Sequence, residues 1–201
     1  YDYDVCVFAS HQKEPESSIR EVAEKNIFSL VNYDLFDAVV VLPDILQVSG
    51  LMMKIEKDLE EKFTGKVIYV DRESTKFTSI MLKHYDPIYR LVSHLIEVHG
   101  YKDIAFVTGH KWHIHSKERL AAFCDCMKDH GLEVPDDHIY FGDYWYTGGV
   151  TVVEDMIREE KKLPEAVACA NDYMAIAVAE TLVKHGIRVP EDVAVVGYDS
   201  V

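Results

Sequence analysis

The sequence predicts an α/β protein in which helices cover both faces of a parallel β-sheet. First, short apolar runs alternate with longer amphipathic segments along the 201 residues. Second, the apolar runs are continuous, which is typical of parallel strands buried on both sides. Third, three expected helices end in His-Gly, at positions 99–100, 130–131 and 185–186. Glycine suits the left-handed residue that closes a helix.

Local signals define the elements of the first 82 residues. Pro43 ends the apolar run DAVVVL, because proline cannot donate a hydrogen bond within a sheet, and Gly65 precedes the run KVIYV. The amphipathic segments between apolar runs indicate helices with one face on the sheet. In order, we expect a strand at 5–9, a helix at 16–32, a strand at 37–42, a helix at 46–62, and strands at 66–70 and 78–82.

The remaining residues repeat this alternation more regularly. Their apolar runs IAFVT, AVACA and VAVV predict buried strands, and the His-Gly pairs mark the ends of the helices. In order, we expect a helix at 87–99, a strand at 104–108, a helix at 116–130, a short strand at 138–141, a helix at 148–160, a strand at 166–170, a helix at 172–185 and a strand at 193–196.

Charge and cysteine usage exclude several classes of protein. With 21 Lys and Arg against 35 Asp and Glu, the net charge is −14, so this chain is not expected to bind DNA by itself. The four cysteines form neither a CxxC zinc pattern nor a disulfide framework, and Cys6 and Cys169 lie in runs expected to be buried. Reduced thiols and a cytoplasmic location are expected. No apolar run reaches 18 residues, so we expect no membrane contact.

The loops that follow the strands are where function is expected, because ligands of parallel sheets bind beyond the carboxyl ends of strands. None of these loops contains GxGxxG, a Walker loop, GxSxG or HExxH. No nucleophile is paired with a base, which favours binding without catalysis and without a cofactor.

Three histidines, His110, His113 and His115, cluster in the loop after the strand at 104–108. They suggest a metal site, but no carboxylate or thiolate stands at a matching spacing, so we expect no bound metal and interpret them as solvated or ligand-contacting residues. The single glycine of Thr108-Gly109-His110 is weak support for a phosphate-binding turn.

Polar and aromatic residues in the other loops form a candidate ligand site. Ser116 is expected to cap a helix, and Arg119 one turn later would point towards the strand ends, although a surface ion pair is the alternative. Asn171 follows the run AVACA and could serve only as a helix cap. Asp199 follows the last strand, and Tyr144 lies in an aromatic loop. Such a set suits a sugar or a similar polar ring, which needs hydrogen bonds at its hydroxyls and an aromatic face.

Two stretches of the chain resemble a known family of ligand-sensing domains. HGYKDIAFVTGHKWHIHSKERLAAFCDCMKDHGLEV and LPEAVACANDYMAIAVAETLVKHGIRVPEDVAVVGYDS resemble the effector-binding domain of LacI–GalR transcription regulators. The resemblance is specific from about His84 to Val201 and looser over residues 1–83. It implies the two-lobed periplasmic-binding-protein type I fold, truncated at both ends, with an incomplete first lobe at 1–82 and a second lobe at 83–201.

The resemblance also implies a ligand and its contacts. Arg119 would take a sugar hydroxyl or an acidic group, and Asn171 would hydrogen-bond the effector. Asp199 would take paired hydroxyls, and Tyr144 would stack on a ring. The effector, a small polar molecule of the carbohydrate class, would bind in the cleft between the lobes and signal to an attached output domain. A homodimer is expected, with DNA contacted only through a segment that this chain lacks.

Several alternatives stay open at this stage. The first half resembles sensor modules fused to GGDEF cyclases, histidine kinases or AraC-type regulators. A periplasmic solute-binding protein shares the fold. An α/β hydrolase or transferase that uses His110 or His115 as a base is a further alternative. The run GIRVPEDVAVVGYDS and the expected reduced thiols favour the cytoplasmic regulator.

Overall fold

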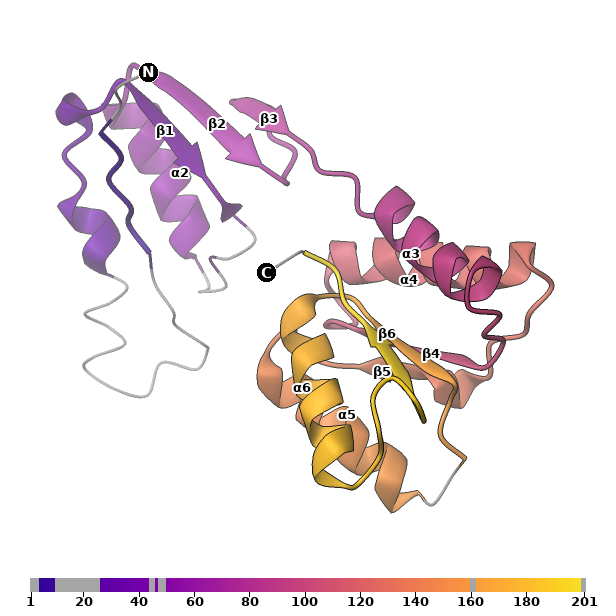
Figure 1. Ribbon diagram of the computed structural model, residues 1–201. Coiled ribbons are helices and arrows are strands. Elements are labelled where there is room, and N and C mark those ends of the chain that lie inside the picture. The colour runs from indigo at the N-terminus through magenta and orange to yellow at the C-terminus, as the bar shows by residue number, and fades with distance from the viewer. Residues whose placement is uncertain (1–3, 10–25, 44–45, 47–49, 160–161, 200–201) are drawn as a thin grey trace. The chain divides into compact units, whose positions relative to one another are not determined.

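The chain divides into two compact units, Tyr1–Leu82 and Lys83–Val201. The computed structural model describes residues 4–9, 26–43, 46, 50–159 and 162–199. Each unit contains its own parallel sheet with helices packed against it (Figure 1), which confirms the predicted α/β class.

The first unit contains a three-stranded parallel sheet in the order β1-β2-β3. Helix α2 packs on one face of this sheet, and the side chains between them form a small core. The elements are η1 (Asn26–Leu30), η2 (Tyr33–Leu35), β1 (Ala38–Val41), α2 (Leu51–Lys62), β2 (Lys66–Val70) and β3 (Thr78–Ile80). The core residues are Val41, Leu51, Ile55, Leu59, Val67 and Tyr69.

The start of the first unit differs from the prediction. Residues 4–9 form no strand, and Cys6 is exposed rather than buried. Their apolar pattern suits a strand, but a strand exists only where a neighbour pairs with its backbone groups, and the described sheet does not include this segment. The expected helix at 16–32 lies mostly outside the described residues, and its described end, Asn26–Leu30, is a 3₁₀ helix.

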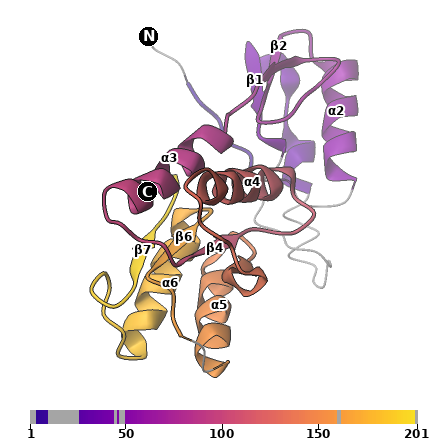
Figure 2. The same ribbon diagram turned by 90° about the vertical axis from the view of Figure 1, so that its right-hand side faces the viewer.

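The second unit contains a four-stranded parallel sheet in the order β5-β4-β6-β7. Helices α3 and α4 pack together on one face and α5 and α6 on the other (Figures 1 and 2). The elements are α3 (Tyr85–Glu97), β4 (Ile104–Thr108), α4 (Ile114–Asp129), η4 (Asp136–His138), β5 (Ile139–Phe141), α5 (Tyr146–Arg158), β6 (Ala166–Cys169), α6 (Asp172–Lys184) and β7 (Ala194–Val196). None of the helices described in either unit is long and apolar enough to cross a membrane.

The central strands show why continuous apolar runs predict a sheet covered on both faces. Every residue of β4 and β6 is buried, and the ring of Phe106 stacks on that of Phe123 in α4 with a centroid distance of 4.9 Å. The glycines at 100, 131 and 186 have φ angles of 73°, 68° and 79°, which confirms the predicted left-handed helix ends.

The beginning of α4 corrects one prediction. The helix starts at Ile114, so Ser116 lies inside the first turn and does not cap it. The ring of His113 takes the capping role, since its Nδ1 accepts a hydrogen bond from the backbone N–H of His115 at 3.3 Å. The prediction assigned the N-cap to Ser116 because serine is common at N-caps, whereas in the structure the His113 ring accepts the capping hydrogen bond.

Candidate functional site

The carboxyl ends of β4, β6 and β7 bring polar and aromatic side chains to one edge of the second sheet. Arg119 reaches this edge from α4, Asn171 lies two residues after the end of β6, and Asp199 follows β7. Parallel strands place all their carboxyl ends at the same edge, which is why residues far apart in sequence meet there.

Arg119 is the most constrained of these side chains. Its side chain is buried, and Nη1 donates a hydrogen bond to the carbonyl oxygen of Ala170 at 2.6 Å. Nη2 lies 3.0 Å from Nδ1 of His84, and the guanidinium carbon lies 4.6 Å from the ring centroid of Tyr198. The Nε of Arg119 is buried and has no hydrogen-bond partner among the described residues. A guanidinium desolvated in this way can bind an acceptor group of a ligand.

Tyr144 packs across the site from Arg119, whose guanidinium carbon lies 5.6 Å from its ring centroid. The hydroxyl of Tyr144 lies 2.7 Å from Oγ of Ser116, and its φ is 67°. A Cβ atom on Gly109 would collide with the Tyr144 ring. Gly109 is therefore required by the close approach of this ring, and the structure gives the glycine a role other than that of a phosphate-binding turn.

Asn171 serves as the N-cap of α6. Its Oδ1 accepts a hydrogen bond from the backbone N–H of Met174 at 3.1 Å, and its Nδ2 donates to the carbonyl oxygen of Tyr144 at 2.8 Å. The buried amide thus holds both the start of α6 and the backbone of Tyr144. A direct contact between Asn171 and an effector stays a prediction.

Asp199 is the exposed member of the predicted set, and its φ is 136°. Partial desolvation raises the pKa of its carboxyl group, and the positive charge of Arg119 opposes this shift. Asp172 adds to the shift, and His84 opposes it. The structure therefore brings Arg119, Tyr144 and Asn171 into a connected group and places the Asp199 carboxyl within the electrostatic reach of Arg119.

Known proteins match this chain in sequence. Residues 92–201 match the model of the periplasmic binding protein-like domain. The chain belongs to this family. A curated relative, the HTH-type transcriptional repressor PurR of Actinobacillus pleuropneumoniae, is 36% identical over 113 residues, which are 56% of this chain and 33% of the relative. PurR of Vibrio parahaemolyticus is 28% identical over 203 residues, covering 100% of this chain and 56% of that protein. The chain thus spans between a third and about half of the length of these relatives.

Solved structures show the same relationship. A sugar-binding transcriptional regulator of the LacI family from Escherichia coli, complexed with phosphate, is 29% identical, with a TM-score of 0.65 over 82% of this chain and 58% of that one. The E. coli transcriptional repressor AscG is 28% identical, with a TM-score of 0.66 over 89% of this chain and 63% of that one. These relatives identify the chain as an effector-binding domain of the LacI–GalR type, as its sequence motifs indicated. These relatives are named as transcription regulators, which agrees with the prediction of a binding module without catalysis.

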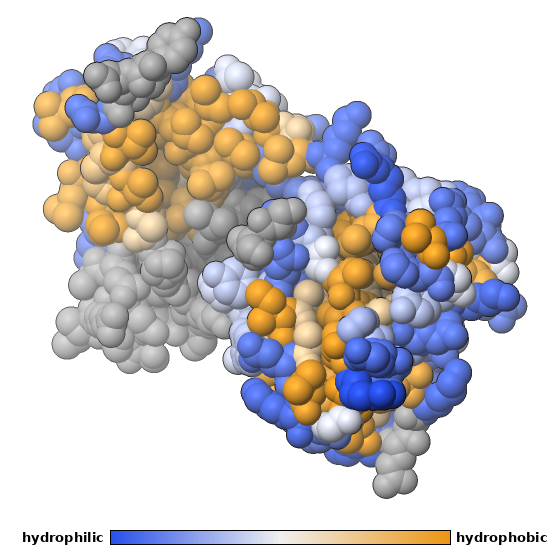
Figure 3. Space-filling model, in the orientation of Figure 1, coloured by the Kyte–Doolittle hydropathy of each residue, from blue (hydrophilic) through white to orange (hydrophobic). Residues whose placement is uncertain are grey.

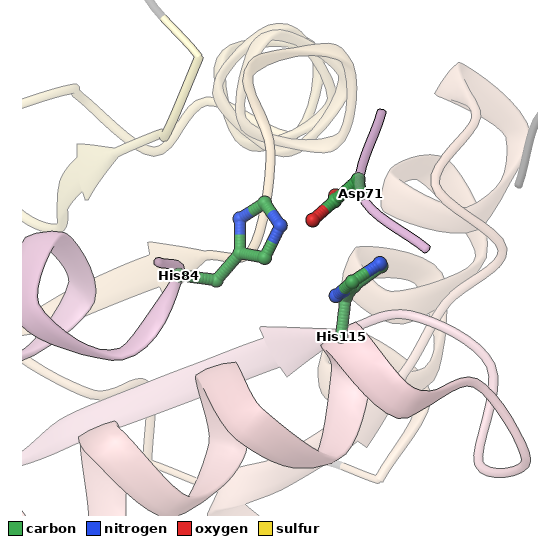
Figure 4. A group of neighbouring side chains, drawn as sticks. All are labelled: Asp71, His84 and His115. Atoms are coloured by element: carbon green, nitrogen blue, oxygen red, sulfur yellow. The ribbon is translucent and has the colours of Figure 1, made fainter. Parts of the chain in front are cut away.

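Two residues of the effector-binding domain that touch Arg119 were not predicted from the sequence. His84 is buried, its Nδ1 lies 3.4 Å from the hydroxyl of Tyr198, and its ring lies 4.5 Å from that of His115. Figure 4 shows the two imidazoles facing each other, His84 from the start of α3 and His115 from the first turn of α4 (the labelled Asp71 belongs to the first unit). No local pattern marks His84, whereas Tyr198 adjoins Asp199 in the GYD motif.

The histidine loop supplies further rings to the same edge. The rings of His110 and Trp112 stack at a centroid distance of 5.3 Å, and the ring of His113 lies 5.7 Å from that of Tyr144. The Trp112 side chain is 65% exposed, so the loop presents an open aromatic surface beside the buried Arg119. Together these groups can hydrogen-bond a polar ring and pack on its face.

Proposed function

We propose that this chain is the ligand-sensing domain of a LacI-type transcription regulator and that it binds a carbohydrate effector at the carboxyl edge of the second sheet. The observation that carries this proposal is the buried guanidinium of Arg119, which Ala170 and His84 hold in place while its Nε has no partner among the described residues. An acceptor oxygen of a ligand supplies the hydrogen bond that this donor group needs.

The surroundings of Arg119 favour a sugar over a simple anion. The rings of Tyr144 and Tyr198 flank the guanidinium, and the aliphatic face of a sugar packs well on such rings. The carboxyl group of Asp199 would accept hydrogen bonds from two adjacent hydroxyl groups of a bound sugar. It would repel an anionic ligand. A solved relative that is 29% identical is titled a sugar-binding regulator, which supports the same ligand class.

We propose that the DNA-binding output domain lies outside this chain, which covers 33% and 56% of two PurR relatives. Relatives named as transcriptional repressors support a DNA-binding output, and the net charge of −14 argues against DNA contact by this domain itself. We propose a cytoplasmic homodimer for the whole protein. A sensor module of a multidomain signalling protein is the alternative, and the sequence of the full-length protein distinguishes the two.

Thermal-shift titration with a panel of mono- and disaccharides and with flat heterocyclic bases tests the effector class. We expect a sugar to raise the melting temperature of the chain. Asp199→Asn and Arg119→Lys should each weaken this effect at least tenfold, since the first removes a charged acceptor and the second removes the fork of donors that the buried guanidinium supplies. Asp136→Asn, a change in an exposed carboxyl group of η4, is the matched control and should respond like the wild type.

Other results would overturn the proposal in identifiable ways. Stabilisation by heterocyclic bases and by none of the sugars would refute the carbohydrate while keeping the site. A sugar response of unchanged strength in both Asp199→Asn and Arg119→Lys would refute the site.

A further inference from the structure

Two histidines, His94 and His99, lie close together at the carboxyl end of α3. His84 lies at the other end of this helix. The Nε2 atoms of His94 and His99 lie 3.2 Å apart, and both side chains are exposed. Neither residue belongs to the histidine loop or contacts Arg119, so the effector site does not account for this pair.

The close of the helix explains how the two rings meet. Residues five apart on a straight helix point about 140° away from each other, so His94 and His99 would not face one another if α3 continued. Instead Gly100 adopts a φ of 73°, and the backbone N–H of Tyr101 donates to the carbonyl oxygen of Leu95 at 3.2 Å. This left-handed turn closes the helix and folds His99 back beside His94.

Neighbouring contacts hold the pair in position. The ring of Tyr101 stacks on that of His99 with a centroid distance of 5.7 Å and an interplanar angle of 16°, and Tyr101 itself packs against the core of the second unit. The His94 and His99 rings meet edge to face at 4.9 Å. Because these rings are already oriented, a ligand that joins them loses little conformational entropy.

The spacing of the two nitrogens matches the requirements of one metal ion. Zinc–imidazole bonds are about 2.0 Å long, and two of them at a tetrahedral angle place their nitrogens roughly 3.3 Å apart. Without an ion, one imidazole can donate its Nε2 proton to the other. The carboxyl end of a helix also favours positive charge. The nearby carboxylate of Glu97 already pairs with His130, whose Nε2 lies 3.0 Å from Oε1 of Glu97, so we do not count Glu97 among the metal ligands.

We propose that His94 and His99 form a surface chelate for a late first-row divalent cation such as Cu²⁺ or Zn²⁺. Each neutral imidazole supplies Nε2 as a ligand, and water completes the coordination, so the ion exchanges with solvent. Two imidazoles bind Cu²⁺ more tightly than Zn²⁺, following the general order of affinities for nitrogen ligands.

Isothermal titration of the 201-residue chain with CuCl₂ and with ZnCl₂ in a non-chelating buffer tests this site. We expect one ion per chain, with tighter binding of Cu²⁺, and at least tenfold weaker binding in His94→Ala and in His99→Ala, because either change leaves a single ligand. His185→Ala is the matched control, since His185 also precedes a helix-closing glycine but its Nε2 lies 3.1 Å from Glu154. This variant should bind like the wild type.

The imidazole NMR signals supply a second measurement that does not depend on affinity. Substoichiometric Zn²⁺ should shift the ring signals of His94 and His99 together. Loss of binding in His113→Ala with wild-type binding in His94→Ala would overturn the proposal, as would equal losses in His99→Ala and His185→Ala, or no binding at all. Both residues of the pair are exposed, and we expect the melting temperatures of their variants to match that of the wild type.

Discussion

The two units contain the same kind of parallel sheet but differ in how the described residues cover it. In the second unit all of β4 is buried between the helix pairs α3–α4 and α5–α6. In the first unit Val41 and Val67 lie under α2, whereas Val40 of β1 and Ile80 of β3 are 61% and 50% exposed. Figure 3 shows hydrophobic surface gathered over this side of the first unit.

This difference shows what a strand pattern cannot specify. The runs DAVVVL and EAVACA look alike in sequence, and both predict a strand buried on two faces. In the structure β6 is buried throughout, while β1 alternates between exposed residues and residues that are partly or fully buried. The apolar run determines that a strand forms, and the elements packed on the sheet determine which of its faces is buried.

Truncation of the core of the second unit should have the largest effect. Phe106→Ala removes a fully buried ring that stacks on Phe123, and we expect a loss of about 3–5 kcal/mol in the free energy of unfolding of that unit. Hydrogen exchange followed by mass spectrometry should show faster exchange in peptides of residues 83–201 and unchanged exchange in those of 50–70. Equal losses in both units would mean that they unfold as one.

A matched pair of valines tests the difference in coverage directly. Val107→Thr places a hydroxyl in a fully buried position of β4, which should cost about 1–3 kcal/mol, while the shape of the side chain stays the same. Val40→Thr makes the same change at a residue that is 61% exposed, and we expect a change within about 0.5 kcal/mol. Chemical denaturation of both variants measures the difference. A loss at Val40 as large as that at Val107 would show that the open face of β1 is covered in solution.

The His130–Glu97 pair, which joins α4 to α3, should make the second unit sensitive to pH near neutrality. The Cys126 carbonyl oxygen and then the Glu97 carboxylate raise the pKa of His130 above its ordinary 6.5. The stabilisation is therefore fully present below pH 6.5 and is lost as the pH rises through the raised pKa. As the pH rises from below 6.5 through the raised pKa of His130, the denaturation midpoint of the wild type should decrease, and that of His130→Ala should change less. An identical pH profile in both proteins would contradict this assignment.

The smallest effect is expected from an exposed ion pair under acid conditions. Hydrogen bonds from the side chain of Arg188, and then from its backbone N–H, lower the pKa of Asp192 from 3.8 to about 2. The stabilisation is present above pH 3.8 and is lost as the pH falls through about 2, so Asp192→Asn should flatten this part of the acid-denaturation curve. Lys62→Met, which removes the exposed pair with Asp58 in the first unit, should leave the curve almost unchanged. A larger effect from Lys62→Met would reverse the expected order.

Much of the fold was predictable because its signals are local. The strands at 66–70 and 104–108 were predicted with the bounds that the structure shows, since each is a short apolar run between polar segments. Helix starts were less accurate, as at α4, because several kinds of side chain can cap a helix. The expected strand at 5–9 failed because an apolar run does not form a strand without a neighbour to pair with.

The candidate site was partly predictable for a topological reason. Asn171 and Asp199 follow strands of the parallel sheet, Arg119 lies one turn into a helix, and the family resemblance implied their ligand contacts. The structure places all three at one edge of the sheet. The partners of Arg119 were not predictable, since His84 is 35 positions away in the sequence and the Ala170 carbonyl 51 positions away. No local pattern connects residues so far apart.

The sequence by itself determined the α/β class, the family and the edge of the sheet where polar loops gather. Apolar periodicity, glycines at helix ends and family motifs are local patterns that can be recognised without the structure. Only the tertiary structure decided which groups desolvate Arg119, which face of β1 is exposed, and that the left-handed turn at Gly100 brings His94 and His99 together. Desolvation and convergence depend on distances between side chains, and these distances exist only once the helices and strands have packed.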